Sequence, residues 1–475
     1  MTQEYDLIVI GAGAVGENVA DRIVQGGLTA AIVERELIGG ECSYWACMPT
    51  KALLRDAAAL RAVRHLPGAS AAVTGDLDIA AVLRRRDAFA SHWKDDGQAD
   101  WLDSAGIALF RGEGRIRSTR SVQVIGADGE TTVLTARHAV VIATGSSARI
   151  PAIEGLADAA PWTSREAASA ASVPGRLAII GGGVVATEMA TAFSSFGSTV
   201  TIVARNGLLP AVEPFASELA AKSLRANDVA LHLGTEPTRI TRDEAGEVQL
   251  ELADGSILVA DEVLVATGRN PNTTSLGLEN VGLTPGAWLT VDDSLRVDGV
   301  EGDWLYAAGD VNRRVLLTHQ GKYQARVLGD SIVARAHGAA LDETLWGRHA
   351  FTADDRAVPQ VIFGDPEIAT VGYTVAAATL RGINIRAVEY DLASVAGAGL
   401  HADGYEGRAL MVVDEDRRVV VGFTIAGPDV AELLHSATIA IAGEVPLDRL
   451  WHAVPSYPTV SEVWLRLLET YGRDA

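Results

Sequence analysis

The hydrophobic pattern of the chain opens with a short apolar run at 5–10, a glycine-rich turn, an amphipathic stretch at 17–27 and a second apolar run at 29–34. Short apolar runs beside glycines are typical of buried strands, and the longer amphipathic stretch is typical of a helix. The order strand, turn, helix, strand predicts a βαβ unit with parallel strands. Two further helical stretches follow at 52–66 and 79–105.

The same pattern returns near the middle of the chain. The segment at 176–205 repeats the order strand, glycine turn, helix, strand, and its "AIIGGG" corresponds to "IVIGAG" in the first unit. An apolar strand ending in "ATG" follows each unit, at 143–145 and at 266–268. Two such units predict an α/β fold with two tandem Rossmann-like dinucleotide-binding domains. From about 346 onwards, alternating strands and one helix predict a third domain of α+β type.

Composition and charge limit the partners of such a chain. A formal charge of −21 disfavours nucleic acid and anionic membranes, because both need a positive protein face. No run of eighteen apolar residues appears, so we expect no membrane span. The first apolar run is short and has no basic segment before it, which predicts a strand rather than a signal peptide. With two cysteines in 475 residues, we expect a cytoplasmic protein whose close cysteine pair is catalytic or redox-sensing.

The first glycine turn predicts a dinucleotide site. Gly11, Gly13 and Gly16 directly follow an apolar strand and open a helix. The first glycine allows the tight turn, the second lets a pyrophosphate approach the backbone, and the third lets helix and strand pack closely. Glu34 ends the next strand, where a carboxylate can bond a ribose 2′-hydroxyl. Strand, helix and acid together predict dinucleotide binding far more specifically than the glycines alone.

The second glycine turn has Gly181, Gly183 and Ala186 in the equivalent positions. At the end of its second strand, Ala204 takes the place of the acid and Arg205 follows. A carboxylate there would repel the 2′-phosphate of NADP, whereas an arginine can make a forked, charge-assisted contact with it. This favours NADPH over NADH; the alternative is a surface arginine beside a permissive NAD pocket.

Both cysteines lie in "GGECSYWACMPTK" at 39–51. Residues five apart in a straight helix rise about 7.5 Å along its axis, which is too far for a disulfide. Pro49 is best tolerated in a first helical turn, so we expect the helix to begin between Cys47 and Pro49, after a distorted turn that contains Cys42. This turn can bring the sulfurs together, and the helix N-terminus favours a thiolate at Cys47.

These motifs together resemble the class I pyridine nucleotide–disulfide oxidoreductases, the family of dihydrolipoamide dehydrogenase, glutathione reductase and mercuric reductase. The family signature G-G-x-C-x4-C-x-P-S/T-K is matched from Gly39 to Lys51. The resemblance covers nearly the whole chain, including both "ATG" strands, "YAAGDV", "DPEIATVGYT" and the C-terminal "YPTVSE". The domains that it implies are an FAD domain (1–150 and 272–345), an NAD(P)H domain (151–271) and a C-terminal dimerisation domain (346–475).

The resemblance also implies roles for individual residues. Cys47 would face the flavin as a thiolate, and Cys42 would exchange with the substrate. Lys51 would pair with Glu188 beside the flavin. The residues implied for FAD are Gly11, Gly13, Gly16, Glu34, Gly40, Lys51, Gly114, Thr144, Gly145, Asp310 and His319. Those implied for the nicotinamide nucleotide are Gly181, Gly183, Ala186, Arg205, Gly268 and Arg269. A homodimer with active sites completed across its interface is also implied, and no resident metal.

The C-terminal motif departs from the family pattern. Members that reduce disulfides carry a histidine that shuttles protons across the dimer and a glutamate that orients it. Here Tyr457 takes the place of the histidine, and Glu462 keeps the place of the glutamate. Mercuric reductase also has a tyrosine there, but this chain lacks that enzyme's C-terminal cysteine pair. His452 either substitutes for the histidine or packs locally. Between the cysteines, the bulky Tyr44 and Trp45 either narrow access to the pair or pack beneath it.

Three hypotheses for function follow. In the first, electrons pass from NADPH through FAD to the Cys42–Cys47 disulfide and on to a small acceptor that needs little proton shuttling, such as a quinone, a soft metal ion or an activated disulfide. The second is a dihydrolipoamide dehydrogenase or glutathione-type disulfide reductase in which Tyr457 or His452 assists exchange. The third is a slow, flavin-bound redox sensor.

Overall fold

The computed structural model describes residues 2–473, which cluster into two compact units. Unit 1 comprises the described residues of Met1–Pro49, Asp87–Arg149 and Gly268–Asp354. Unit 2 comprises the described residues of Thr50–Arg86, Ile150–Thr267 and Asp355–Ala475. Three helices run from one unit into the other: α3 (Cys47–Arg64), α5 (Ile79–Phe89) and α11 (Ala353–Arg356).

The main sheet of unit 1 has the strand order β3-β2-β1-β6-β5-β4, and β16 also pairs with β6. Its strands are β1 (Thr2–Ile10), β2 (Ala30–Glu34), β3 (Ala108–Arg111), β4 (Glu113–Ser118), β5 (Ser121–Ile125), β6 (Thr131–Ile142) and β16 (Leu305–Ala307). The pairs β1–β2, β1–β6, β2–β3 and β6–β16 are parallel, as a Rossmann-like unit requires. Two short strands, β7 (Ser146–Ala148) and β15 (Arg269–Pro271), pair antiparallel.

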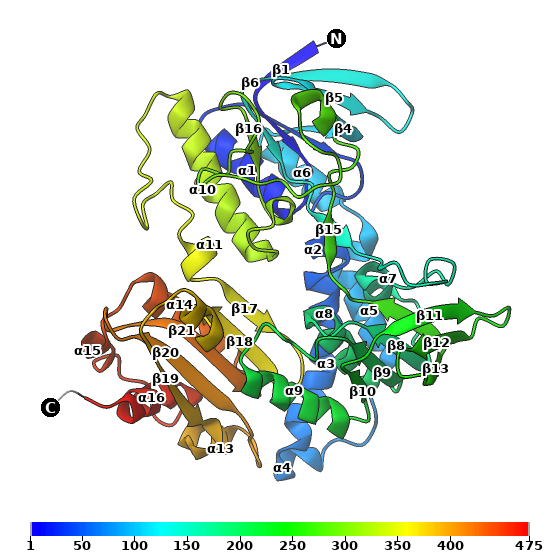
Figure 1. Cartoon of the computed structure of the whole chain (residues 1–475), viewed down its shortest axis with the longest axis vertical. Helices are drawn as coiled ribbons and strands as arrows, with labels where there is room; N and C mark the ends of the chain where they lie inside the picture. The colour runs from blue at the N-terminus through cyan, green and yellow to red at the C-terminus, as the bar shows by residue number, and fades with distance from the viewer. Residues whose placement is uncertain (1, 474–475) are drawn as a thin grey trace. The chain divides into compact units, whose positions relative to one another are not determined.

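The helices of unit 1 are α1 (Ala14–Gln25), α2 (Gly40–Tyr44), α6 (Asp96–Ser104), α10 (Thr318–Ala336) and the 3-10 turns η1 (Ser91–Trp93), η2 (Leu278–Val281) and η3 (Asp310–Asn312). Helices α1 and α10 lie side by side (Figure 1). Glycines allow this close approach, because a Cβ at Gly321 would lie 2.5 Å from Val15 and a Cβ at Gly329 would lie 2.7 Å from Arg22.

Unit 2 contains a parallel sheet, a small antiparallel sheet and a larger antiparallel sheet. The parallel sheet has the order β10 (Ala230–Leu233), β9 (Thr199–Ala204), β8 (Arg176–Ile180) and β14 (Glu262–Val265). The small sheet has the order β11 (Pro237–Arg242), β12 (Val248–Leu252) and β13 (Ile257–Ala260). The larger sheet has the order β17 (Pro359–Ile362), β18 (Glu367–Gly372), β21 (Val419–Gly427), β20 (Arg408–Asp414) and β19 (Ile385–Asp391), and Figure 1 shows α14 packed beside β18 and β21.

The helices that lie wholly in unit 2 complete it. They are α4 (Pro67–Ser70), α7 (Ser164–Ser169), α8 (Val184–Ser195), α9 (Pro214–Ala226), α12 (Val375–Leu380), η4 (Leu392–Ser394), α13 (Ala396–His401), η5 (Ala431–Leu433), α14 (Leu434–Ala442), α15 (Leu447–Leu450), η6 (Val460–Glu462) and α16 (Val463–Tyr471). Within residues 2–473, no helix is both long and apolar enough to cross a membrane.

The predicted fold class is confirmed, since two Rossmann-like units with parallel strands are followed by an α+β segment; the sheet of the first unit also contains the antiparallel pairs β4–β5 and β5–β6. Residues 50–86 lie within the expected FAD domain (1–150) but belong to compact unit 2, where Leu53, Leu54 and Val82 share a core with Ile179 and Phe193. Burial of these apolar side chains decides the grouping. The division into FAD, NAD(P)H and dimerisation domains remains a prediction about function.

Candidate functional site

The first glycine turn has the close contacts that its spacing predicts. Gly11 has a φ of 104°, and a Cβ there would lie 2.5 Å from the carbonyl oxygen of Ala143. A Cβ at Gly16 would lie 1.9 Å from the carbonyl oxygen of Gly11, so only glycine fits between helix and strand. At Gly13, by contrast, a Cβ would meet nothing within 4 Å. The space beside Gly13 is where the motif brings a pyrophosphate to the helix N-terminus.

Glu34 closes this turn from the neighbouring strand. Its Oε2 accepts a hydrogen bond from the backbone N–H of Ala12 at 2.7 Å, and its Oε1 accepts one from Glu36 at 2.7 Å. Gly40, at a φ of 59°, lies against the turn, since its Cβ would approach the Cα of Gly13 to 2.9 Å. Glu34 is thus anchored at the rim of the space beside Gly13.

Three other residues expected to bind FAD also lie in unit 1, and they differ in their surroundings. The hydroxyl oxygen of Thr144 is buried and has no hydrogen-bond partner among residues 2–473. Gly145, at a φ of 66°, has open space where a Cβ would lie. Gly114 has the opposite surroundings, because a Cβ there would lie 2.9 Å from Ile10. The open space at Gly13 and the orphaned hydroxyl both fit a bound dinucleotide such as FAD.

Asp310 lies in a polar cluster with Ser146 and Arg269. The Ser146 hydroxyl donates to Asp310 Oδ2 at 2.5 Å, and Arg269 Nε donates to the Ser146 hydroxyl at 2.5 Å. Arg269 Nε also lies 3.7 Å from the same Asp310 oxygen. The family resemblance implies that Arg269, together with Gly268, borders the nicotinamide nucleotide. In the structure Arg269 contacts a residue expected to bind FAD, and both residues belong to unit 1.

The two cysteines lie on either side of a helix break. Cys42 lies in α2, the chain turns at Trp45, where φ is −136°, and α3 begins at Cys47 as the position of Pro49 predicts. The hydrogen bond with Cys47, burial and the charge of Cys47 raise the pKa of the Cys42 thiol above its ordinary value. The Cys47 sulfur lies 3.4 Å from the hydroxyl of Thr318.

This geometry separates the roles of the two thiols. A thiolate is stabilised at a helix N-terminus, where Cys47 stands. A raised pKa keeps Cys42 protonated while its neighbour carries the charge. The positive charge of Lys322, in α10, lowers the pKa of Cys42 only in part. The pair can therefore hold one proton and one negative charge between the two sulfurs.

Tyr44, between the cysteines, is fully buried. Its hydroxyl donates to the carbonyl oxygen of Ile38 at 3.0 Å, and its own carbonyl accepts the indole N–H of Trp93 at 3.2 Å. The Trp45 ring lies against it at 5.7 Å between centroids. Of the two alternatives, packing applies to Tyr44, which supports the short helix that carries Cys42.

In unit 2, Lys51 and Glu188 form the ion pair that the resemblance implies. Lys51 Nζ lies 2.8 Å from Glu188 Oε2, and the Glu188 side chain is 3% exposed. The other carboxylate oxygen of Glu188 accepts the backbone N–H of Phe363 at 3.0 Å. Lys51 also lies over the Phe363 ring, 5.1 Å from its centroid. The carboxylate therefore fixes the ammonium group in one place; its role beside the flavin remains a prediction.

The second glycine turn repeats the first within unit 2. Gly181 has a φ of 125° and a Cβ there would lie 2.2 Å from the carbonyl oxygen of Ala266, whereas the space at Gly183 is open. Ala186 is fully buried. Arg205 follows β9 on the surface, and its Nη1 lies 3.3 Å from a Glu236 carboxylate oxygen. The guanidinium is exposed at the strand end where the motif brings the ribose.

The C-terminal motif brings together less than the sequence predicts. Tyr457 is 75% exposed, and Glu462 is 5% exposed. Glu462 Oε1 accepts a hydrogen bond from Arg466, and its Oε2 is buried without a partner among residues 2–473. Within that same range, no hydrogen bond joins Glu462 to Tyr457 or to His452, which is exposed. Within one chain, Glu462 therefore orients neither Tyr457 nor His452, the two candidates for the proton-shuttling residue.

Sequence reasoning missed the residues that approach the sulfurs from α10. Thr318 contacts Cys47, and Lys322 acts on Cys42 through its charge. Thr318 is next in sequence to His319, the exposed residue that the resemblance implies for FAD binding. This position was the only feature of the sequence that could have pointed to Thr318. No group of three His, Cys, Asp or Glu side chains in the described part of the chain is arranged to hold a metal ion.

Comparisons with known proteins cover nearly the whole chain. A family model described as pyridine nucleotide-disulphide oxidoreductase matches residues 5–325. A second, described as the dimerisation domain of pyridine nucleotide-disulphide oxidoreductases, matches residues 358–467.

Curated relatives carry two different names. A mercuric reductase of Acidithiobacillus ferrooxidans is 33% identical over 99% of this chain and 83% of its own length. A dihydrolipoyl dehydrogenase of Haloferax volcanii is 31% identical over 98% of this chain and 95% of its own length. Among solved structures, the HOCl-induced flavoprotein disulfide reductase RclA from Escherichia coli has a TM-score of 0.82 and 25% identity, and covers 98% of this chain and 99% of its own.

Proposed function

Because the chain belongs to the pyridine nucleotide–disulfide oxidoreductase family and is an FAD-dependent enzyme of that family, we propose that it oxidises NADPH and reduces a thiophilic metal ion through Cys42 and Cys47. The observation that supports this proposal most strongly is the contact between the Cys42 sulfur in α2 and the Cys47 sulfur at the start of α3. A tyrosine in place of the proton-shuttling histidine supports it as well. Different residues would bind FAD, bind NADPH and pass electrons to the acceptor.

The residues of unit 1 would hold FAD. The pyrophosphate would lie beside Gly13 at the start of α1, Glu34 would bond the ribose, and Asp310 would bond the ribityl chain. When bound, FAD supplies the transfer of electrons from the nicotinamide to the cysteine pair. The protein contributes binding and orientation, and Lys51 places a fixed positive charge by its pairing with Glu188.

NADPH would bind at the second glycine turn. The exposed Arg205 guanidinium can leave Glu236 and make a forked contact with a 2′-phosphate, which carries more charge than one carboxylate. Ala204, at the end of β9, is buried and offers no carboxylate to repel the phosphate. We therefore expect a higher kcat/KM for NADPH than for NADH, and Arg205→Ala is expected to reduce that preference.

The reduced cysteine pair would serve a soft acceptor. Two thiols formed by two electrons and two protons can bind one thiophilic ion as thiolates, with release of the protons to solvent. Transfer of the two electrons to one Hg(II), or to two Cu(II) in turn, would re-form the disulfide. Such an acceptor needs no base on the protein to complete the exchange, which suits the exposed Tyr457. One relative is named a mercuric reductase, and RclA has also been solved as a Cu(II) complex. Quinones and activated disulfides are the other acceptors that need little proton shuttling, and they are the alternatives to a metal ion.

A second candidate is dithiol–disulfide exchange of the dihydrolipoyl dehydrogenase type. The buried Glu462 oxygen without a partner favours it, because that glutamate orients a proton-shuttling residue in disulfide-reducing members. In this case Tyr457 or His452 would take the role of the histidine. Lipoamide turnover that falls on Tyr457→Phe would support this candidate over the first.

The test compares acceptors in the wild type and in Cys47→Ser. We expect NADPH-dependent reduction of Hg(II) or Cu(II) to exceed lipoamide turnover, and Cys47→Ser to lose at least about 100-fold in rate, since it removes the sulfur that receives electrons from the flavin. Ser43→Ala, between the cysteines, is the matched control and should retain activity. Acceptor reduction that Cys47→Ser leaves unchanged would contradict the proposal, because electrons would then bypass the cysteines.

A further inference from the structure

The turn that carries Asp310 has a strained backbone. Gly309, which precedes η3, has a φ of 78°, and Arg313, which follows it, has a φ of 58°. A positive φ is unfavourable at a residue other than glycine, so such a turn persists only where its surroundings hold it. A Cβ at Gly309 would lie 3.0 Å from the side chain of Val15 in α1. The turn is thus set tightly against the first glycine motif.

The buried side chain of Gln324, in α10, holds both ends of this turn. Its Oε1 accepts the backbone N–H of Gly309 at 2.8 Å and the side-chain amide of Asn312 at 3.0 Å. Asn312 also donates to the carbonyl oxygen of Ala307 and accepts the backbone N–H of Arg314, each at 3.0 Å. Gln324 is fully buried and Asn312 is 6% exposed, so water does not replace these bonds.

The carboxylate of Asp354 determines which way the Gln324 amide points. Gln324 Nε2 donates to Asp354 Oδ2 at 2.7 Å, and Gln320 Nε2 donates to Oδ1 at 3.0 Å. An amide has donors at one end and an acceptor at the other. With a carboxylate on one side and two donors on the other, only one orientation of the Gln324 amide satisfies every group.

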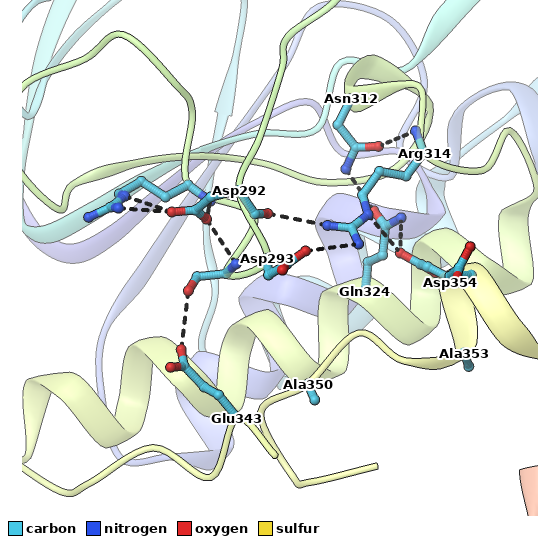
Figure 2. Close-up of polar contacts among 12 residues, drawn as sticks. Asp292, Asp293, Asn312, Arg314, Gln324, Glu343, Ala350, Ala353 and Asp354 are labelled. Atoms are coloured by element: carbon cyan, nitrogen blue, oxygen red, sulfur yellow. Dashed lines mark hydrogen bonds and ion pairs between the residues drawn. The ribbon is translucent and has the colours of Figure 1, made fainter. Parts of the chain in front are cut away.

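The positive charge of Arg314 also favours the ionised form of this carboxylate. Its Nε lies 3.7 Å from Asp354 Oδ2, and its Nη2 lies 3.6 Å from Asp293 Oδ1 (Figure 2). Burial raises the pKa of Asp354 to about 6, although Gln324, Arg314 and Gln320 each lower it. With a pKa of about 6, the carboxylate is largely ionised at neutral pH and can accept both amide bonds.

We propose that Gln324, oriented by Asp354, is the positioning residue that holds the Gly309–Asn312 turn in the shape that binds FAD. The inference rests on the proposed function, because it takes Asp310 as a flavin-binding residue. Gln324 acts through the backbone of the turn. The same helix begins at Thr318, which contacts the Cys47 sulfur, so α10 supports both the flavin-binding turn and the reactive thiol.

The test exchanges the two side chains in the full-length protein. Gln324→Glu keeps an acceptor for the turn but places a second carboxylate against Asp354. The double variant Gln324→Glu/Asp354→Asn restores one carboxylate and one amide in reversed order. Gln324→Leu removes both contacts. Ser331→Ala, which removes another buried polar group of α10, is the control. The readouts are the dissociation constant of FAD, from the recovery of free-flavin fluorescence on dilution, and the melting temperature without FAD.

We expect Gln324→Glu and Gln324→Leu each to weaken FAD binding at least about tenfold, as the loss of buried hydrogen bonds predicts. The double variant should recover most of the loss, and Ser331→Ala should bind FAD like the wild type. Unchanged FAD affinity in Gln324→Glu would overturn the inference and leave the proposed function standing. A loss that the double variant does not recover, together with a lower melting temperature, would show a merely structural role and overturn it too. A wild type that binds no FAD would overturn both.

Discussion

At the scale of single residues, Cys47 has the largest influence on the pKa of Cys42. The hydrogen bond with Cys47 is the largest cause that raises the pKa of Cys42, followed by burial and the charge of Cys47. Removal of the Cys47 sulfur leaves burial as the remaining large cause. In the reduced protein, Cys42 should therefore ionise at a lower pH once Cys47 is replaced.

The first prediction uses the reduced Cys47→Ser variant. The rate of Cys42 alkylation by iodoacetamide, followed by mass spectrometry against pH, is expected to rise at a lower pH than in the reduced wild type, because only the thiolate reacts. Thr318→Val keeps the Cys47 sulfur but removes a hydroxyl whose hydrogen bond lowers the pKa of Cys42, so it should move the midpoint in the opposite direction, to higher pH. A midpoint for Cys42 in Cys47→Ser that stays the same or moves up would contradict the account of the pair.

Glu17, the residue after the third glycine of the first motif, provides the second prediction. Burial raises the pKa of its carboxyl to about 7, and its Oε1 has no hydrogen-bond partner among residues 2–473. The folded state thus holds a proton that the unfolded state loses above about pH 4.5, so stability falls as the pH rises from 4.5 to 7. Each pKa unit corresponds to about 1.4 kcal/mol, which makes the total about 3 kcal/mol.

Glu17→Gln should remove this dependence. Relative to wild type, the variant is expected to gain about 3 kcal/mol in the free energy of unfolding between pH 4.5 and pH 8. Urea denaturation of both proteins at the two pH values measures the difference, and all other titrating groups cancel in the comparison. A wild type and variant that keep the same difference at both pH values would refute a raised pKa.

Individual residues differ in how far the sequence could reveal them. Cys42, Cys47 and the glycines stand in local patterns whose spacing has a physical meaning, and the predicted helix start at Cys47 is confirmed. Thr318 could not be paired with Cys47, because 271 residues separate them and only the fold brings them together. Local patterns do not contain such long-range contacts.

At the scale of elements, the second and third glycines of the first turn should respond differently to the same substitution. A Cβ at Gly16 would meet the backbone oxygen of Gly11 at 1.9 Å, and a backbone group cannot move aside as a side chain can. A Cβ at Gly13 would meet no protein atom within 4 Å, but it would occupy the space where a pyrophosphate approaches.

The third prediction compares these two variants. Gly16→Ala is expected to lower the free energy of unfolding of the FAD-free protein by about 1–3 kcal/mol. Gly13→Ala should leave that stability close to wild type and weaken FAD binding at least about tenfold, because it blocks the approach of the phosphate. Chemical denaturation and flavin fluorescence measure the two effects. Full FAD affinity in Gly13→Ala would contradict a pyrophosphate at this turn.

The elements themselves were largely predictable, but their grouping was not. The βαβ pattern predicted the parallel strands β1 and β2, and the later repeat predicted β8 and β9. The helices α3 and α5 carry apolar faces that do not specify a partner in the sequence. Their side chains Leu53 and Val82 pack in the core of unit 2, and only the three-dimensional structure shows this choice.

At the scale of the whole molecule, the match to a dimerisation domain over residues 358–467 leads us to propose a homodimer. Val454 and Tyr457 are 83% and 75% exposed in one chain, which suits a surface that a partner covers. The fourth prediction is that light scattering gives twice the 49.8 kDa of one chain and that Val454→Asp lowers this mass. A wild type that is monomeric at micromolar concentration would contradict it.

The central claim is that electrons from NADPH reach the cysteine pair, and thiol counting tests it most directly. The fully oxidised protein is mixed with one equivalent of NADPH without oxygen, and its thiols are then trapped by alkylation and assigned by mass spectrometry. We predict that two thiols form per NADPH consumed, one at Cys42 and one at Cys47. NADPH oxidation with no new thiol at either position would contradict the account.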